Sequence, residues 1–190
     1  MRHAASTDTL LGRELAKRHV TVHGKDGATY LLRPIAASDA ASLIRGYDAM
    51  SDDSKWYRML NTVPHLSVAA AQKFCSPDPE RELCVVVEGR GELQGEILGG
   101  ARIAGEADDR TAEFSVSLRP EAQGLGLAHR ALEMALEEAR EMGYEAVWGL
   151  IARSNEPMLR LARRIGFKTS TCPDDIALVR AEIRLMQQKR

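Results

Sequence analysis

The chain has 190 residues, 44% hydrophobic and 28% charged, with 26 basic against 27 acidic side chains. This size and composition predict an ordinary globular domain whose core buries enough surface to fold without disulfides or a metal ion. The net charge of −1 excludes a broadly basic protein that holds nucleic acid by neutralising its phosphates.

The first half of the chain predicts a polar lead-in, a hairpin and short helices. Residues 1–19 carry only a weak apolar stripe and are expected to form a loosely ordered lead-in, whereas residues 20–190 are expected to form one domain. β-forming residues flank the turn sequence Gly24-Lys25-Asp26-Gly27, which predicts a hairpin. The expected elements are a hairpin over 20–34, a helix from Ser38 that includes Tyr47, a short helix from Ser51 or Asp52 through Leu60, and a helix from Ser67 to Cys75.

In the second half, short β-forming runs are followed by alternating helical and strand patterns. This order predicts a mixed α/β layer with no internal repeat. The expected elements are strands at 83–88, 96–104 and 110–119, a helix at 127–142 that Gly143 ends, a strand at 146–151, a helix that starts near Ser154 or Asn155 and closes at Gly166-Phe167, and a strand at 176–185.

Two further features bear on where the protein works. No apolar run approaches the roughly 20 residues of a membrane-spanning helix, and no hydrophobic segment follows Arg2 as it would in a secretion signal. Cys75, Cys84 and Cys172 are odd in number and lack Cys-x-x-Cys spacing, which predicts thiols in a reducing compartment. We therefore expect a cytoplasmic protein with no membrane or nucleic-acid partner and no metal site.

The strand at 110–119 carries side chains that alternate between apolar and polar. Ala112, Phe114, Val116 and Leu118 alternate with Glu113, Ser115, Ser117 and Arg119. At the period of a β-strand this gives one buried and one polar face. We therefore expect Glu113 to point where a ligand can reach it.

A loop rich in small residues follows this strand and leads into the long helix. Glycine or alanine at 124, 126 and 128 lets a ligand approach the backbone closely, and the N–H groups then face it at the positive end of the helix dipole. A P-loop would end in Gly-Lys-Ser/Thr, but here the chain continues Gly126-Leu127-Ala128. A dinucleotide fingerprint would place Gly or Ala at His129 and an acidic residue after the next strand, which Ile151-Ala152-Arg153 lacks.

The remaining pattern, Gln-x-x-Gly-x-Ala at 123–128, resembles the pyrophosphate loop of the GNAT family of N-acetyltransferases. The resemblance covers about Tyr30 to Leu185 and includes Asn155 and Gly166-Phe167. Within the family, the chain is most similar to the acetyltransferase domain of bacterial protein lysine acetyltransferases. The segments that carry this likeness are Leu32–Ile35, Ser51–Arg58, Ala112–Phe114 and Asn155–Ala162.

The resemblance implies a GNAT fold of the α/β (α+β) class, with a central mixed, mostly antiparallel twisted sheet flanked by helices, and acetyl-CoA as co-substrate. It also implies that the CoA pyrophosphate binds the loop N–H groups, and that the pantetheine arm pairs with a strand edge freed by a β-bulge. The residues thus expected to bind CoA are Val116, Ser117, Leu118, Gln123, Gly124, Leu125, Gly126, Leu127, Ala128 and Asn155.

Attack on a thioester requires a neutral amine, and because a free lysine has a pKa of about 10.4, a base is needed. By the resemblance, this base is Glu113, acting directly or through water. Many family members place a tyrosine in the helix after the asparagine as general acid, where this chain has Ala162. The acceptor is expected to be a protein lysine, with a small amine such as a polyamine, amino acid or drug as the alternative. A CoA-binding sensor without turnover is a third hypothesis, and a homodimer would be compatible with the fold.

Overall fold

The computed structural model describes residues 18–49, 65–108 and 110–185. Within them, eight strands form one sheet in the order β1-β2-β3-β4-β5-β6-β8-β7. The strands are β1 (Val20–His23), β2 (Thr29–Pro34), β3 (Glu82–Glu88), β4 (Ile97–Gly105), β5 (Thr111–Leu118), β6 (Ala146–Ala152), β7 (Lys168–Thr171) and β8 (Leu178–Arg184).

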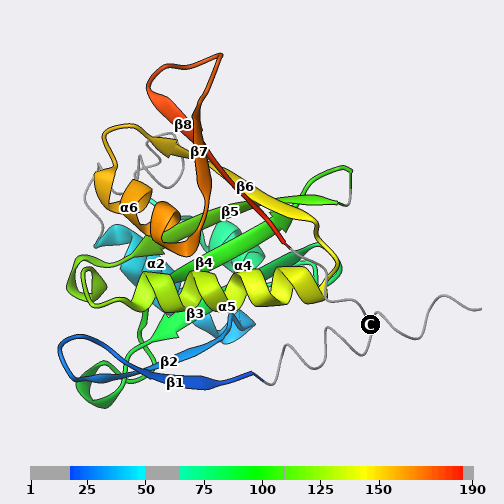
Figure 1. Cartoon of the computed structure of the whole chain (residues 1–190). Helices are drawn as coiled ribbons and strands as arrows, with labels where there is room; N and C mark the ends of the chain where they lie inside the picture. Colours follow the sequence, from blue (N-terminus) through cyan, green and yellow to red (C-terminus); the bar gives the residue numbers. More distant parts are fainter. Residues whose placement is uncertain (1–17, 50–64, 109, 186–190) are drawn as a thin grey trace, which may run out of the picture.

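Helices cover both faces of this sheet (Figure 1). On the near face of that view lie α5 and α6, which contact each other. On the far face lie α2 and α4, which also contact each other. The helices are α2 (Ala40–Asp48), α4 (Val68–Phe74), α5 (Leu127–Glu141) and α6 (Glu156–Ile165), with single 3₁₀ turns η1 (Ala37–Asp39), η2 (Gly91–Leu93) and η3 (Pro120–Ala122).

All strand pairs in the described sheet are antiparallel except β5 and β6. A parallel pair needs a long crossover, and α5 provides it between β5 and β6. The mixed, mostly antiparallel sheet flanked by helices is therefore confirmed. The core lies between the sheet and α5, where Leu132, Ala135 and Ala139 are fully buried against strand residues such as Val87 and Ile103.

Most of the predicted elements are present with boundaries shifted by a few residues. The hairpin at 20–34 forms as β1 and β2, and Ser67 caps α4 by accepting a hydrogen bond from the Ala70 N–H. Gly143 and Gly166 adopt left-handed conformations at the ends of α5 and α6. The Phe167 N–H donates to the Ala162 carbonyl at 2.9 Å, which forms a Schellman ending where the helix was predicted to close, at Gly166-Phe167.

Two expectations are corrected. No strand was expected at Lys168–Thr171, because these four residues show no apolar alternation. In the structure they form β7, and all four side chains are exposed. The last strand begins at Leu178 rather than Ile176, which is 84% exposed. The lead-in, the helix expected at 51–60 and the Ser51–Arg58 segment lie outside the described residues, apart from Arg18 and His19. The single domain at 20–190 stays a prediction.

Candidate active site

The candidate site is a V-shaped opening between β5 and β6. These strands pair only at Thr111↔Ala146, Ala112↔Val147 and Glu113↔Trp148. This pairing ends at Glu113, so none of the described strands pairs with β5 from Ser115 to Leu118 on the β6 side. At about 3.4 Å per residue, this edge offers an extended ligand a backbone track of roughly 10 Å.

The expected β-bulge is absent from the register of β5 with β4. Pairing of β5 with β4 runs without a shift from Ala112↔Gly105 to Leu118↔Gly99, and the register shift recorded in the described sheet is at Val87/Glu88. On the other side of the opening, β6 stays paired with β8 over all seven of its residues. The opening therefore lies between β5, which is held by β4, and β6, which is held by β8.

The Gln123–Ala128 loop lies at the open end of the V, between β5 and α5. Gly124 and Gly126 have φ values of +74° and +85°, a conformation that glycine adopts without strain. The N–H groups of residues 124–128 have no hydrogen-bond acceptor among the described residues. A Cβ on Gly124 would meet no atom within 4 Å. The loop is therefore an open cradle of donors at a helix N-terminus, which suits an anionic group.

Side chains of this loop hold its shape. The Gln123 side-chain amide donates to the Leu118 carbonyl at 3.1 Å, so it closes the turn after β5. Leu127 is buried and Leu125 packs against the core, so these two side chains anchor the loop to the core. Val116 and Leu118 also pack on the core, whereas Ser117 faces the opposite side of the sheet.

Asn155 lies after β6 and caps α6. Its side-chain oxygen accepts a hydrogen bond from the Met158 N–H at 3.2 Å, which shows the capping role. The side-chain nitrogen has no acceptor in the part of the chain that the structure describes. Position 162 on α6 is a fully buried alanine. Tyr144 is also buried, and its hydroxyl donates to the Arg81 carbonyl at 2.8 Å, so it is a core residue.

Glu113 lies at the apex of the V, as the last residue of β5 that pairs with β6. Its side chain is exposed, and none of the described residues forms a hydrogen bond or ion pair with it. Desolvation by the surrounding protein raises the pKa of its carboxyl, and repulsion from Glu106 raises it further. The structure therefore places a carboxylate with a raised pKa where the two strands separate, as a general base requires.

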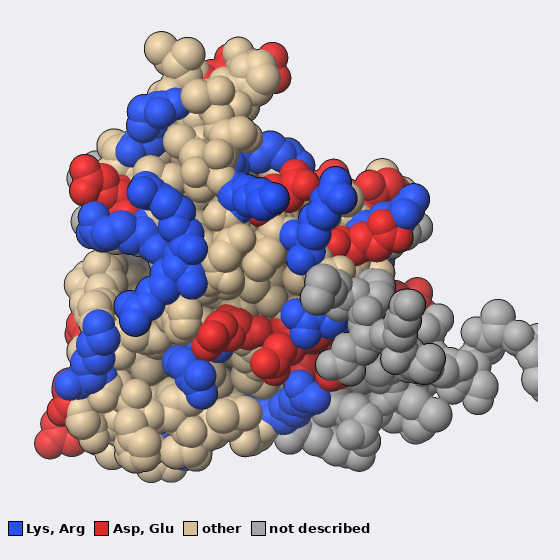
Figure 2. Space-filling view, viewed as in Figure 1, with Lys and Arg blue, Asp and Glu red and all other residues tan. Residues whose placement is uncertain are grey.

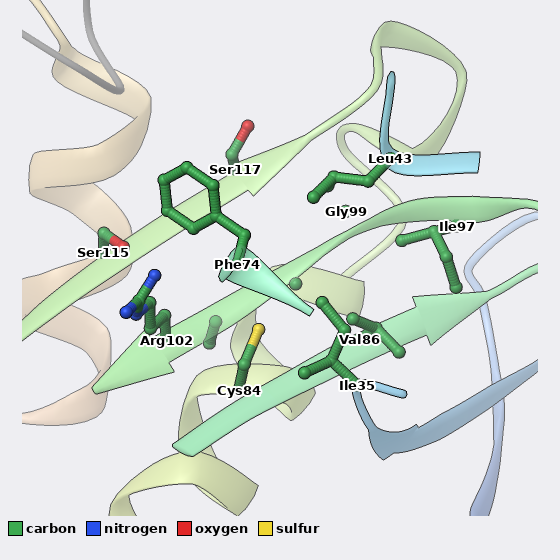
Figure 3. A pocket seen from close by; sticks show the side chains of 12 residues that line it. Ile35, Leu43, Phe74, Cys84, Val86, Ile97, Gly99, Arg102, Ser115 and Ser117 are labelled. Atoms are coloured by element: carbon green, nitrogen blue, oxygen red, sulfur yellow. The ribbon is translucent and has the colours of Figure 1, made fainter. Parts of the chain in front are cut away.

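A pocket lies on the face of the sheet that α2 and α4 cover, the face opposite α5 (Figure 3). Ser115 and Ser117 of β5 reach it, so it lies on the same face of the strand as Glu113. The Arg102 guanidinium lies 5.0 Å from the centre of the Phe74 ring and is paired with Glu82 at 2.7 Å. The remaining lining is Ile35, Leu43, Cys84, Val86, Ile97, Gly99, Gly100 and Ala101.

Sequence reasoning missed this pocket, although Gly99-Gly100 in the middle of a strand was a signal for it, since glycine in a strand marks close backbone approach. A Cβ on Gly99 would lie 2.1 Å from the Ser117 carbonyl oxygen, and one on Gly100 would lie 2.2 Å from the Val85 carbonyl oxygen. The two glycines therefore let neighbouring backbone approach closely at the floor of the pocket.

Basic side chains gather beside the V. Figure 2 shows Lys and Arg over α6 and the N-terminal end of α5. Arg160, Arg163 and Arg164 belong to α6, and of these Arg160 pairs with Glu156 at 3.1 Å.

Within the described residues there is no cluster of potential metal ligands and no helix long and apolar enough to cross a membrane.

Comparison with known proteins shows the family of the chain. Residues 30–168 match the model of the acetyltransferase (GNAT) domain family. The chain belongs to the GNAT family of acetyltransferases. This GNAT enzyme is 25% identical over 152 residues to an acetyltransferase of Pseudomonas aeruginosa, a match that covers 79% of this chain and 81% of the relative.

Solved GNAT structures share the fold. The GNAT domain of S. lividans PAT superposes with a TM-score of 0.78 at 26% identity, covering 88% of this chain and 97% of that domain. Spermidine N-acetyltransferase from Vibrio cholerae, solved with CoA and spermine, superposes with a TM-score of 0.65 at 18% identity, covering 82% and 95%. The enzyme uses acetyl-CoA as its co-substrate, and the open donor cradle at residues 124–128 fits the pyrophosphate of that molecule.

Proposed function

We propose that this GNAT enzyme acetylates lysine side chains of proteins, with Glu113 as general base. The observation that carries the proposal is the pocket on the Glu113 face of β5. Its described lining is mostly apolar, and its charged member, Arg102, is already paired with Glu82. A lysine side chain has four apolar methylene groups and a single ammonium, so it suits an apolar pocket on the face of β5 that also carries one carboxylate, that of Glu113.

The lining argues against a polyamine as the preferred acceptor. Such a molecule carries several ammonium groups, and burying each of them requires a partner carboxylate. The described lining contains no carboxylate that could pair with a second ammonium. Glu113, at the apex of the V, supplies one carboxylate for one amine.

In the proposed reaction, acetyl-CoA supplies the thioester carbonyl that the amine attacks. Glu113 accepts a proton from the lysine ammonium, directly or through water, and the neutral nitrogen forms a bond to the carbonyl carbon. A backbone N–H near Leu118 donates to the carbonyl oxygen as it gains negative charge. The carbon–sulfur bond then breaks, and the thiolate leaves with the electron pair. The nitrogen gives up its second proton to the thiolate or to water, which leaves a neutral amide.

The proposed mechanism needs no tyrosine at position 162. A thiol such as that of CoA has a pKa of about 8.5, so its thiolate is a competent leaving group with little or no protonation. The fully buried Ala162 therefore does not prevent turnover.

The proposal is tested by an acceptor panel with radiolabelled acetyl-CoA. We expect label transfer to lysine-containing peptides and to proteins, and weak transfer to spermidine, spermine and free amino acids. Peptides in which the lysine is acetylated beforehand, and which have a blocked N-terminus, are the matched negative control. Efficient transfer to polyamines with none to lysine peptides would contradict the proposal and favour the small-amine alternative.

We also propose that the enzyme works in the cytoplasm, because its three cysteines are thiols rather than disulfides. The homodimer stays a prediction, and sedimentation velocity on the full chain tests it.

A further inference from the structure

The tip of the β1–β2 hairpin docks on the Gln123–Ala128 loop. The Lys25 backbone N–H donates to the Leu125 carbonyl at 3.1 Å. The Cε of the Lys25 side chain lies 4.0 Å from the position that a Cβ on Gly126 would occupy. A residue about 100 positions away in the sequence therefore lies beside Gly126, the N-cap of α5.

This contact comes from a tightly ordered turn. The Tyr30 hydroxyl donates to the Asp26 carboxylate at 2.7 Å, and the Ala28 N–H donates to the same carboxylate at 3.1 Å. Gly24 is required beneath it, because a Cβ there would lie 2.4 Å from the Asp26 carboxylate oxygen. The turn also closes through the Gly27 N–H, which donates to the Gly24 carbonyl at 3.0 Å.

The base of the hairpin is anchored as well as its tip. Just before β1, Arg18 pairs with Glu138 at 2.8 Å and with Glu141 at 3.2 Å, near the C-terminal end of α5. The Lys25 contact lies at the opposite end of the same helix. The hairpin is therefore attached near both ends of α5, and its tip lies beside the loop.

The Lys25 side chain is exposed and forms no ion pair within the described residues. Asp26, its neighbour in sequence, is held by Tyr30 and by backbone N–H groups, and these hydrogen bonds lower the pKa of the Asp26 carboxyl. No ion pair joins Lys25 to any carboxylate of the described chain. By contrast, Arg130 in the first turns of α5 is paired with Glu133 at 3.3 Å. Lys25 is thus an exposed cation, fixed at its backbone, beside a cradle of N–H donors.

We propose that Lys25 is a phosphate-binding residue for CoA, positioned by the Gly24–Gly27 turn. Its ammonium binds either the pyrophosphate or the 3′-phosphate of the co-substrate. The inference rests on the use of acetyl-CoA and not on the acceptor, so a lysine, a polyamine or any other acceptor leaves it unchanged.

Isothermal titration calorimetry on the full chain tests the proposal without an acceptor or turnover. We expect Lys25→Gln to raise the Kd for CoA by about three- to tenfold, the range of one charge-assisted contact at a solvent-accessible site. The loss should shrink in high salt, because screening weakens the wild-type contact. Lys73→Gln, an exposed lysine of α4 on the other face of the sheet, is the matched control and should bind as wild type does.

Titration with 3′-dephospho-CoA distinguishes the two phosphates. If Lys25 binds the 3′-phosphate, wild type and Lys25→Gln will bind this analogue equally. If it binds the pyrophosphate, the variant will bind the analogue more weakly as well. A Kd for CoA within twofold of wild type, or an equal loss in Lys73→Gln, would overturn the proposal.

A second variant tests the role of the turn. Tyr30→Phe removes the hydroxyl that holds Asp26, and we expect it to weaken CoA binding less than Lys25→Gln does. In a Lys25→Gln background the same change should have no further effect on the Kd, because the lysine that the turn positions is gone. Additive losses in the double variant would show that Tyr30 acts through the general stability of the hairpin, and would overturn the positioning role.

Discussion

At the scale of single residues, a substitution of Glu106 should change the pKa of Glu113. Desolvation is the larger cause of its raised pKa and Glu106 the smaller. A general base works only when deprotonated, so kcat/KM should rise with pH through the pKa of Glu113. We expect Glu106→Gln to remove the repulsion, lower that pKa, and move the acidic limb of the pH–rate profile to lower pH.

Glu113→Gln removes the proposed base itself. This variant should lose the acidic limb of the pH–rate profile, and its kcat should fall by about 10²- to 10⁴-fold. The measurement is kcat/KM against pH with one lysine peptide, and the Kd for CoA should stay unchanged in both variants. A Glu113→Gln enzyme with the wild-type rate and profile would assign the base to another group.

The sequence placed Glu113 correctly on the polar face of its strand, because side chains of a strand alternate strictly. It did not reveal the surroundings of that face. Arg119 shares the polar alternation but is buried, 8% exposed, against Ser42 and Glu96. Alternation assigns a residue to a face, whereas what covers that face depends on contacts between residues that are distant in sequence.

At the scale of elements, the two ends of α5 offer a matched test of the loop. Gly126 and Gly143 have φ values of +85° and +96°, and a Cβ on either would meet nothing closer than 4.0 Å. Alanine at either position should therefore cost about 1–2 kcal/mol of unfolding free energy through backbone strain alone. Only Gly126→Ala distorts the donor cradle, so it alone should weaken CoA binding.

Urea unfolding and calorimetry of the two glycine variants separate these effects. Equal losses of stability with unequal losses of CoA affinity are expected. If Gly143→Ala weakened CoA binding as much as Gly126→Ala, the effect would come from the stability of α5 as a whole, and the role assigned to the loop would be wrong.

Among the elements, the long helix and the strand before it were predictable because their apolar spacing is regular over many residues. The opening between β5 and β6 was expected only through family resemblance, and its cause was assigned to a bulge that the register lacks. The end of the pairing at Glu113 involves β6, which pairs with β8 over its whole length, and no local pattern in β5 encodes it.

At the scale of the whole molecule, one ion cluster joins α2 to the residue that follows β5. Glu96, just before β4, accepts hydrogen bonds from Arg119 at 3.1 Å and from Ser42 of α2 at 3.2 Å, and also pairs with Arg45 of α2. Gly46 allows this packing, since a Cβ there would lie 2.7 Å from the Arg119 Nε. The cluster fixes α2, which contributes Leu43 to the pocket.

Breaking this cluster should cost stability and acceptor affinity together. Arg119→Met leaves Glu96 with Arg45 and Ser42 and should lower the free energy of unfolding by about 1–3 kcal/mol, less than a fully buried pair because Glu96 remains partly exposed. Arg160→Met removes an exposed pair with Glu156 and should change stability little. Because α2 shifts, the KM for the acceptor should rise in Arg119→Met while the Kd for CoA changes little.

The same cluster predicts a pH dependence of stability. Hydrogen bonds from Arg45 above all, and then from Arg119 and Ser42, lower the pKa of Glu96 in the folded protein. A carboxyl with a depressed folded pKa stabilises the fold above its unfolded pKa, and this contribution is lost as the pH falls through the folded value. Glu96→Gln should therefore be less stable than wild type near neutral pH, and the difference should narrow at about pH 4 and below. Urea unfolding of both proteins at the two pH values measures this, and a difference independent of pH would show that the charge of Glu96 does not hold α2 against the sheet.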